Sequence, residues 1–505
     1  MTKRNVYINV LTVLFAFITV SVNCFANVAL PAVFSDHMVL QQKSTAQFWG
    51  WADPGETVSI SVDWSAKSNA VTTNDSGKWM LTLQTPAAGG PYTIRINGKN
   101  KLEIKDVLIG EVWVCSGQSN MVFSLKSSYE AGAEIEKANY PSIRYFSVER
   151  QYGPHPFEDA PGSVWKKTTS QTAPSFSAVA YFFAKKIHET LHVPVGIIYA
   201  AWGGTPAEAW TPSTVIKNDD SLSLYIDRWK YIQENVGKDS AEYHIKLKQW
   251  EQNNNSSVKK PGEPQTFYYY KRPWREPGVL FNGMISPVIP YAIKGVLWYQ
   301  GESNVGYADE YEYLFTKMIE SWRKQWHKNL PFYFVQLAAY GYDRMDAAAR
   351  VRQAQYNVAK KLANTGMAVT VDVGNMNDIH YTHKKEVGGR LAFIALAKNY
   401  GYKNIIYQGP ECTSVIKKGK KLELTFDQSL FTDDKKKVAG FEIGYYQNDS
   451  LIFLKATSSI YDNKIYVWNE NIKDPIVIRY AWLDIGEANI VNKEGLPAPP
   501  FQKKL

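Results

Sequence analysis

A serine and a histidine that lie far apart in the sequence are the residues best placed to do chemistry together. Ser119 follows the apolar run 112–115 and stands two residues after Gly117, so it can occupy a tight turn with its hydroxyl exposed. A serine hydroxyl needs a general base to attack at neutral pH. Of the eight histidines, His380 is the best candidate, because it lies after another apolar run and is flanked by Asp378. Either residue alone fits a helix cap or an ordinary loop position, but their joint placement indicates nucleophilic catalysis by serine.

Three further apolar runs end in the same way as the run before Ser119. Residues 197–202 lead into Gly203-Gly204, and residues 296–299 lead into Gln300-Gly301-Glu302-Ser303-Asn304. Residues 369–373 are predicted to form a strand that leads towards His380. Because open α/β sheets place their ligands at the carboxyl ends of strands, we expect these polar ends to meet at one sheet edge.

Two other side chains that could be reactive, His383 and Cys115, are not expected to take part in the reaction. His383 lies three residues after His380 and suggests a metal pair, but no third ligand has suitable spacing. Ester hydrolysis by a serine needs neither a metal nor another cofactor, so none is expected. Cys115 is expected to be buried at its strand end and inert.

Strands that alternate with helices predict an α/β fold for residues 106–403. Helical periodicity covers residues 177–191, 350–362 and 385–399, and residues 332–337 read as a further buried strand. Such alternation is typical of a parallel sheet covered by helices. This region is the expected catalytic domain.

The regions on either side of it are expected to be all-β. Residues 27–105 contain short alternating strands separated by turn signals, as in a β-sandwich domain, and residues 404–505 return to the same pattern. The second region either completes the first sandwich or forms one of its own. A chain of 505 residues is long enough for two or three domains.

A polar insertion at about 213–280 interrupts the α/β region. It has helical character, continues into a loop-like stretch at 253–257, and ends in an aromatic and basic segment that contains Arg272 and Arg275. The insertion either borders the mouth of the active site or packs outside it.

The N-terminus has the features of a secretory signal. Lys3 and Arg4 precede an apolar segment at 10–22, and cleavage is expected after Ala26. A lipoprotein anchor at Cys24 is the alternative, although Asn23 fits such a site poorly. No later run is long and apolar enough to span a bilayer, so a periplasmic or secreted protein is expected.

Composition and charge exclude some classes of function. The hydrophobic share of 45% and the charged share of 21% are those of a globular chain, and the abundant Trp and Tyr suit carbohydrate handling as well as β-rich cores. The formal net charge of +9 is modest for this length, and the lysine clusters look like hairpin turns. Nucleic acid is therefore not an expected partner. The sequence is silent on oligomeric state.

The strand-end blocks closely resemble those of the SGNH hydrolases, and among these the sialate O-acetylesterase family. The blocks are Gly117-Gln118-Ser119-Asn120-Met121, Trp202-Gly203-Gly204-Thr205-Pro206, Trp298-Tyr299-Gln300-Gly301-Glu302-Ser303-Asn304 and Asp378-Ile379-His380. The resemblance extends nearly end to end, from Phe34-Ser35-Asp36-His37-Met38 to Glu494-Gly495-Leu496-Pro497-Ala498. It implies a three-layer, flavodoxin-like α/β domain together with β-sandwich domains.

The resemblance also assigns roles to these residues. Ser119 would attack an acetyl carbonyl carbon, and His380 would relay the proton. The oxyanion would be held by the N–H groups of Ser119 and Gly204, or its neighbour Gly203, and by the Asn304 side chain. Gln118 and Gln300, from the same blocks, are expected substrate contacts, as are Arg272 and Arg275.

The acidic member of the triad stays open between two residues. Many SGNH enzymes have an aspartate three residues before the histidine, but that position is Asn377 here, and Asp378 lies two before. Glu302 offers a carboxylate from a neighbouring strand end. Either could hold the imidazole tautomer, while Asp378 could equally shape a turn and Glu302 form a structural ion pair.

The expected activity is removal of O-acetyl groups from sugars, with sialic acids as the expected substrates, through an acetyl-serine intermediate. An acetylxylan esterase is the alternative within the same class, because such enzymes resemble the family in the same blocks. A non-catalytic carbohydrate-binding protein, in which the β regions do the work, is the alternative from another class. The expected partner is an acetylated sugar or glycan substrate.

Overall fold

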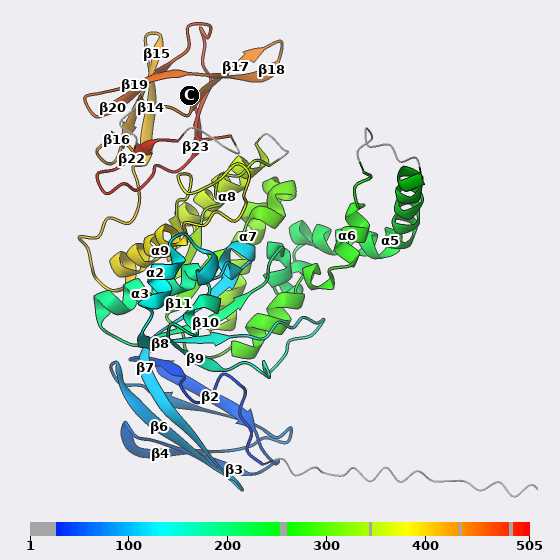
Figure 1. Ribbon diagram of the computed structural model, residues 1–505, viewed down its shortest axis with the longest axis vertical. Helices are drawn as coiled ribbons and strands as arrows, with labels where there is room; N and C mark the ends of the chain where they lie inside the picture. The colour runs from blue at the N-terminus through cyan, green and yellow to red at the C-terminus, as the bar shows by residue number, and fades with distance from the viewer. Residues whose placement is uncertain (1–26, 253–259, 343–345, 434–436, 484–487) are drawn as a thin grey trace, which may run out of the picture.

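The computed structural model describes residues 27–252, 260–342, 346–433, 437–483 and 488–505. The expected signal segment, with Cys24, and the loop-like stretch 253–257 lie outside the described residues. The chain has a mixed α/β fold in which a large mixed sheet and several antiparallel sheets follow one another. Figure 1 shows the helix-rich part in the middle, with one β region at each end.

Strand β7 (Lys101–Gly117) connects the first β region to the α/β part. Its first half pairs antiparallel with β6 (Gly89–Asn97), and its second half pairs parallel with β10 (Val195–Ala201) and β11 (Gly295–Tyr299). Every residue from position 107 to its end is buried, as expected for a strand covered on both faces. The boundary expected between residues 105 and 106 therefore falls inside one continuous strand.

The parallel strands end level with one another beside Gly117. The strand order is β13-β12-β11-β7-β10-β8-β9, and all pairs are parallel except β8 with β9. Gly117 aligns with Ala201 of β10 and with Tyr299 of β11. The segments after these strands consequently leave the sheet at the same edge. The other strands are β8 (Tyr140–Ser147), β9 (Trp165–Thr168), β12 (Phe332–Val335) and β13 (Thr365–Ala368).

Helices cover both faces of this sheet. On one face, α3 (Ala178–Leu191) and α9 (Lys384–Asn399) pack with Trp113 and Cys115 of β7. On the other face, α7 (Ala308–Gln325) and α8 (Ala347–Lys361) belong to the cluster that contains Val112 and Val114. Successive side chains of a strand point to opposite faces, so each apolar run buries both. The three helices expected from periodicity are thus confirmed as α3, α8 and α9.

The expected strand at 369–373 is wrong. Strand β13 ends at Ala368, and the chain then leaves the sheet in turns. Polar side chains make the difference: the buried Thr370 hydroxyl donates to the carbonyl of Gln336, and Asp372 pairs with Arg390. These groups bond across the sheet edge in ways that a continuing β ladder would prevent.

The first β region packs directly on the α/β part. One pair joins β2 (Thr45–Trp51) to β5 (Lys78–Gln84), and β3 (Thr57–Val62) pairs with β4 (Ser65–Thr72) and β6. Residues such as Phe48 and Ile60 belong to the same hydrophobic cluster as Phe315 of α7. One core therefore runs through both parts.

The C-terminal β region has a core of its own and lies at the opposite end of the molecule (Figure 1). Its described strands pair only among themselves, so it does not complete the N-terminal sandwich. The strands are β14 (Cys412–Lys418), β15 (Lys421–Phe426), β16 (Phe431–Thr432), β17 (Phe441–Gln447), β18 (Ser450–Lys455), β19 (Thr457–Tyr461), β20 (Lys464–Trp468), β21 (Val477–Tyr480), β22 (Ile490–Val491) and β23 (Phe501–Lys504).

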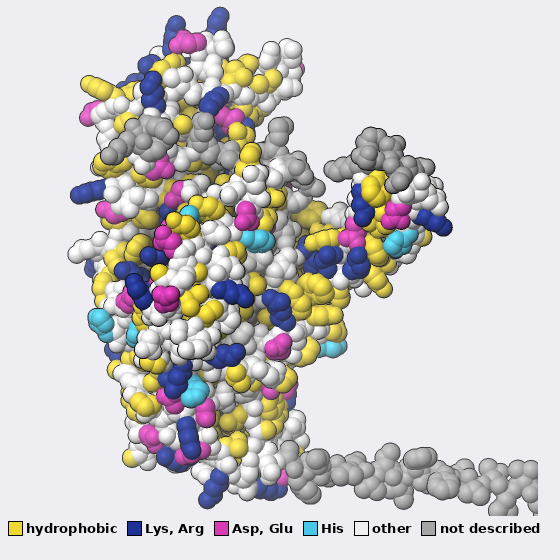
Figure 2. Space-filling view, viewed as in Figure 1, with side chains coloured by type: hydrophobic (Ala, Val, Ile, Leu, Met, Phe, Trp, Pro, Cys, Tyr) yellow, Lys and Arg dark blue, Asp and Glu magenta, His cyan; other side chains and the backbone are white. Residues whose placement is uncertain are grey.

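The insertion is helical and stands away from the body (Figure 1). It contains α4 (Ser213–Lys217), the long α5 (Asp220–Gln252) and α6 (Gln265–Tyr270). Only Leu222 and Tyr225 of α5 are buried. Figure 2 shows acidic and basic side chains interspersed over the visible face of the molecule. Within the described ranges, no helix combines the length and apolar character needed to cross a membrane.

Candidate active site

Ser119 stands on a turn that only glycine permits. Gly117 has a φ of +136°, and a Cβ there would lie 2.1 Å from the carbonyl oxygen of Tyr299. The backbone N–H of Gln118 donates to that same oxygen at 2.9 Å, which fixes the turn against β11. Ser119 then opens the short helix α1 (Ser119–Val122) and is half-buried. The strand-then-turn placement expected for this serine is therefore present.

The two glycines after β10 lie against Ser119. The Trp202 N–H donates to the carbonyl of Gly117 at 3.1 Å, and a Cβ on Gly203 would lie 3.5 Å from the Cβ of Ser119. Gly204 has a φ of +70°, and its carbonyl accepts a hydrogen bond from the Arg275 guanidinium. The backbone of this loop is thus held beside the serine.

Asn120 connects the serine turn to the histidine loop. Its Nδ2 donates to Glu302 Oε1 at 2.5 Å and to the carbonyl of Ile379 at 3.0 Å. Its Oδ1 accepts from Lys384 Nζ at 2.5 Å. Because Asn120 follows Ser119 and Ile379 precedes His380, this one amide brings the neighbours of both residues together.

The two candidate acids lie in different surroundings. Glu302 is half-buried, with its carboxyl turned away from solvent. This burial raises the pKa of the carboxyl, and the Asn120 hydrogen bond and the charges of Lys384 and His380 oppose the rise. Its Oε2 has no hydrogen-bond partner within the described part of the chain. Asp378 is exposed, and its Oδ1 accepts from the backbone N–H of His380 at 2.8 Å, which is the turn-forming role.

Lys384 is a site residue that the sequence did not reveal. It is 2% exposed, and its ammonium lies over the rings of Phe123 and Tyr299. Burial lowers the pKa of Lys384 to about 8. Lysine at a helix start is ordinarily a solvated residue, so only the packing identifies this one.

Asn304 and its partners form a buried amide network. Asn304 Nδ2 donates to Glu208 Oε2 at 2.9 Å, while its Oδ1 accepts from Gln300 Nε2 at 2.6 Å and from the Ala207 N–H at 2.9 Å. Burial raises the pKa of the Glu208 carboxyl. Glu208 was not singled out from sequence, since it lies outside the recognisable blocks.

The two glutamines expected to contact substrate are bonded within the protein. Gln118 is 2% exposed and Gln300 is fully buried. Gln118 Oε1 accepts from the Ser303 N–H at 3.2 Å, and Gln300 Oε1 accepts from the Tyr311 hydroxyl at 3.0 Å. Both side chains hold the strand-end loops in place.

The two arginines of the insertion have different roles. Arg275 is 5% exposed, lies over the ring of Tyr269, and bonds the Gly204 carbonyl. Arg272 lies over the ring of Tyr268 and donates to the carbonyl of that residue at 2.9 Å. Arg275 therefore positions the glycine loop, whereas Arg272 is engaged within α6 and its flank.

The end of the insertion lies beside the loop that follows β11. A cavity of about 550 Å³ is lined by Ser303, next to Glu302, and by Gln265 and Tyr269 of α6. The end of the insertion therefore reaches one strand-end loop, and its placement at the mouth of the active site stays a prediction.

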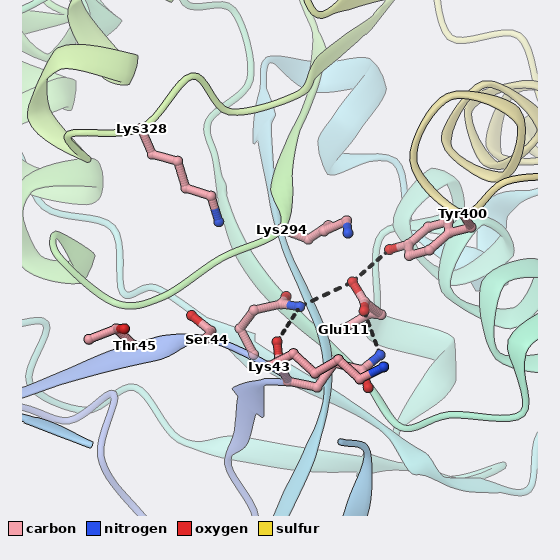
Figure 3. A pocket seen from close by; sticks show the side chains of 9 residues that line it. Lys43, Ser44, Thr45, Glu111, Lys294, Lys328 and Tyr400 are labelled. Atoms are coloured by element: carbon pink, nitrogen blue, oxygen red, sulfur yellow. Dashed lines mark hydrogen bonds between the residues drawn. The ribbon is translucent and has the colours of Figure 1, made fainter. Parts of the chain in front are cut away.

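Another cavity lies at the opposite sheet edge. It measures about 560 Å³ and is lined by Glu111, Lys294, Lys328 and Tyr400. Figure 3 shows Glu111 bonded to Tyr400, with Lys294 beside it and Lys328 farther away at upper left. Glu111 aligns with Val195 at the start of β10, so this cavity lies away from Ser119 and contains none of the strand-end blocks.

The remaining cysteines and His383 take no part in this network. Cys115 and Cys412 are buried free thiols, and burial raises the pKa of Cys412 to about 12. The ring of His383 packs against Tyr129 and Tyr381.

Comparisons with known proteins point to one family. A family model described as carbohydrate esterase, sialic acid-specific acetylesterase, matches residues 109–260 and 270–397. Mouse sialate O-acetylesterase is 30% identical over 516 residues, which cover 92% of each protein. The human sialate O-acetylesterase is 29% identical and covers 92% of this chain and 91% of its own. A crystal structure of a carbohydrate acetylesterase from Xanthomonas citri matches with a TM-score of 0.80 and 31% identity, covering 94% of this chain and 99% of that one.

Proposed function

Because the chain belongs to the sialic acid-specific acetylesterase family of carbohydrate esterases, we propose that it removes O-acetyl groups from sialic acids through an acetyl-serine intermediate. Family membership makes it a carboxylic ester hydrolase that acts on acetylated carbohydrate. The substrate and the covalent step are the proposal.

In the first half of the reaction, Ser119 Oγ attacks the acetyl carbonyl carbon while His380 takes the hydroxyl proton. The negative charge that develops on the carbonyl oxygen is held by the N–H groups of Ser119 and of the Gly203-Gly204 loop. Asn304 adds its side-chain amide, which has two N–H donors, one of them bonded to Glu208. Each such donor contributes about 3 kcal/mol to transition-state stabilisation.

The tetrahedral intermediate then breaks down to acetyl-serine, which is hydrolysed. The C–O bond to the sugar breaks, and His380 gives its proton to the departing sugar oxygen. A water molecule, deprotonated by His380, attacks the acetyl-serine carbonyl. Acetate leaves, and the Ser119 hydroxyl is restored.

We assign the acidic role to Glu302. The Oε2 atom of Glu302 is buried and has no hydrogen-bond partner among the described residues. His380 is close enough for its charge to lower the pKa of the Glu302 carboxyl. A buried carboxylate stabilises an imidazolium strongly, because little water screens the attraction. Asp378 already uses Oδ1 to shape the loop.

The fold supports an SGNH-hydrolase arrangement with three layers. Helices α3 and α9 cover one face of the parallel strands, and α7 and α8 cover the other. We further propose that residues 1–26 are a cleaved secretion signal, which makes the enzyme periplasmic or secreted. We also propose that residues 404–505 form a domain of their own, whereas 27–105 and 106–403 are two parts built on one shared core.

The single observation that carries the proposal is the Asn120 amide, which joins the turn of Ser119 to the loop of His380. Replacement Ser119→Ala should abolish acetate release from O-acetylated sialic acid without lowering the melting temperature. The replacement Ser127→Ala, at an exposed serine of the next turn, is the control. Mass spectrometry of the native enzyme, quenched during turnover, should show one added acetyl group on the peptide that contains Ser119.

Retained activity in Ser119→Ala would refute the nucleophile. Acetylated xylan, assayed in parallel, decides the substrate: faster release from xylan than from the sialic acid would favour the acetylxylan esterase alternative.

A further inference from the structure

Two segments beside the Ser119 turn carry residues that the mechanism does not use. Trp202 follows β10, and its backbone N–H donates to the carbonyl of Gly117 in the turn that leads to Ser119. Arg150 and Tyr152 follow the neighbouring parallel strand β8 and emerge from the same sheet edge. Groups held by these segments therefore lie where the sugar part of a bound ester must extend.

The aromatic side chains here form a stack. The rings of Trp202 and Trp274 are 5.2 Å apart at an interplanar angle of 15°. Tyr152 meets both edge-on, at 6.1 Å and 6.3 Å. Both tryptophans are only half-buried and Tyr152 is 41% exposed, so the stack leaves apolar ring surface open to solvent. Sugar C–H faces pack on such surfaces.

Arg150 adds an available positive charge to this stack. Its guanidinium carbon lies 5.5 Å from the Trp202 ring centroid, and the residue is exposed. Among the described arginines, it alone has neither a carboxylate nor a backbone carbonyl as a hydrogen-bond partner. Its polar neighbour is the hydroxyl of Tyr199, which burial keeps neutral by raising its pKa.

An exposed guanidinium without a carboxylate partner among the described residues is well suited to bind a carboxylate of the ligand. Its planar fork binds a carboxylate through two parallel hydrogen bonds, and the Trp202 ring offers it a cation–π contact. A neutral acetylated sugar would use the rings but not this charge. We propose that Arg150, Trp202 and Trp274 form the subsite for the sugar, with Arg150 binding the carboxylate of an acidic acetylated sugar.

This assignment rests on the proposed function and makes it more specific. It gives the carboxylate-reading role to Arg150 instead of Arg272 or Arg275, whose guanidinium groups are bonded to backbone carbonyls. It also favours sialic acid over xylan, because unsubstituted acetylated xylose units carry no carboxylate.

The test compares two substrates that differ only in charge: an O-acetylated sialic acid and its carboxyl methyl ester, with acetate release as the readout. The native enzyme should have the lower KM for the acid. In Arg150→Ala the KM for the acid should rise about 10- to 100-fold, while that for the methyl ester should change less than about 3-fold. Arg150→Lys should recover part of the difference, because lysine keeps the charge but lacks the fork.

Matched controls separate binding from folding. Arg95→Ala, at a half-exposed arginine of β6 in the N-terminal β region, should leave the ratio of the two KM values unchanged. Trp274→Ala should raise the KM for both substrates by about 10-fold, since the rings contact the sugar whatever its charge. Melting temperatures should show that each variant is folded.

Equal effects of Arg150→Ala on the acid and the methyl ester would overturn the proposal, as would no effect on either. An enzyme that releases acetate from xylan but not from sialic acid would overturn it and leave the Ser119 mechanism standing. Retained activity in Ser119→Ala would instead refute the mechanism, whatever Arg150 does.

Discussion

At the scale of single residues, the site depends on how buried charges are compensated. Lys384, Asn120 and Glu302 form a chain in which an ammonium bonds an amide oxygen and the amide nitrogen bonds a carboxylate. Lys384 is almost fully buried and the Oε2 atom of Glu302 is buried, so each group stabilises the charged form of the other. The Asn120 hydrogen bond and the Lys384 charge favour the ionised form of the Glu302 carboxyl, against the effect of its burial.

The choice between the two acids can be decided by isosteric replacement. Glu302→Gln should lower kcat about 100-fold or more, because the imidazolium loses its buried counter-charge. Asp378→Asn should lower it less than about 10-fold, because an asparagine Oδ1 still accepts the His380 N–H. Steady-state acetate release measures both, and the opposite ranking would return the role to Asp378.

The dependence of kcat/KM on pH should show the titration of Lys384. Its pKa of about 8 means that it carries a proton below that pH and loses it above, so native kcat/KM should fall on the alkaline side near pH 8. Lys384→Met should remove this limb. It should also move the acid limb to higher pH, because loss of the positive charge raises the pKa of Glu302. An unchanged profile in the variant would exclude coupling between the two groups.

At the scale of elements, the turn after β7 is tightly constrained by its neighbours. The sharp turn at Gly117 lets the chain pass within contact of β11 and then present Ser119. The loop after β10 is held at two points: the backbone N–H of Trp202 bonds the Gly117 carbonyl, and Arg275 bonds the Gly204 carbonyl. The geometry of the nucleophile is therefore a property of three strand ends together.

A single methyl group at this turn should be enough to disturb it. Gly117→Ala places a Cβ against the Tyr299 carbonyl in a backbone conformation that alanine rarely adopts, and should cost about 3 kcal/mol of stability. Gly132→Ala, on α2 (Ala131–Glu136), where the added Cβ meets open space, should be neutral or slightly stabilising. Chemical denaturation and esterase activity measure both, and a stable, active Gly117→Ala would contradict the strain argument.

At the scale of the whole molecule, one core joins the N-terminal β region to the catalytic part, and a second core is separate. The first cluster extends from Phe48 and Ile60 to Phe315, and β7 runs through both parts. The C-terminal cluster, which includes Leu424 and Ile465, is distinct. We expect the first two parts to unfold together.

Matched truncations in the two cores test this. Ile60→Ala, fully buried in the N-terminal region, should lower the temperature at which esterase activity is lost, with a stability cost of about 3 kcal/mol. Leu424→Ala, equally buried in the C-terminal core, should leave that temperature nearly unchanged and lower a separate calorimetric transition. Loss of activity at the same lower temperature in both variants would show a single cooperative unit.

The sequence by itself determined the local features. Apolar runs that end in glycine and amide blocks gave the strand ends, and helical periodicity gave α3, α8 and α9, because both patterns express burial that each segment carries within itself. The local pattern wrongly predicted a strand at residues 369–373. There Thr370 bonds Gln336 and Asp372 pairs with Arg390, and the chain leaves the sheet.

Only the tertiary structure decided which charges are buried and which partners they meet. The enclosure of Glu302 and Lys384, the bond from Arg275 to Gly204, and the open guanidinium of Arg150 all depend on segments distant in the sequence. A residue type states what a side chain can donate or accept. Its surroundings set the dielectric and the competing partners, and these determine what the side chain does.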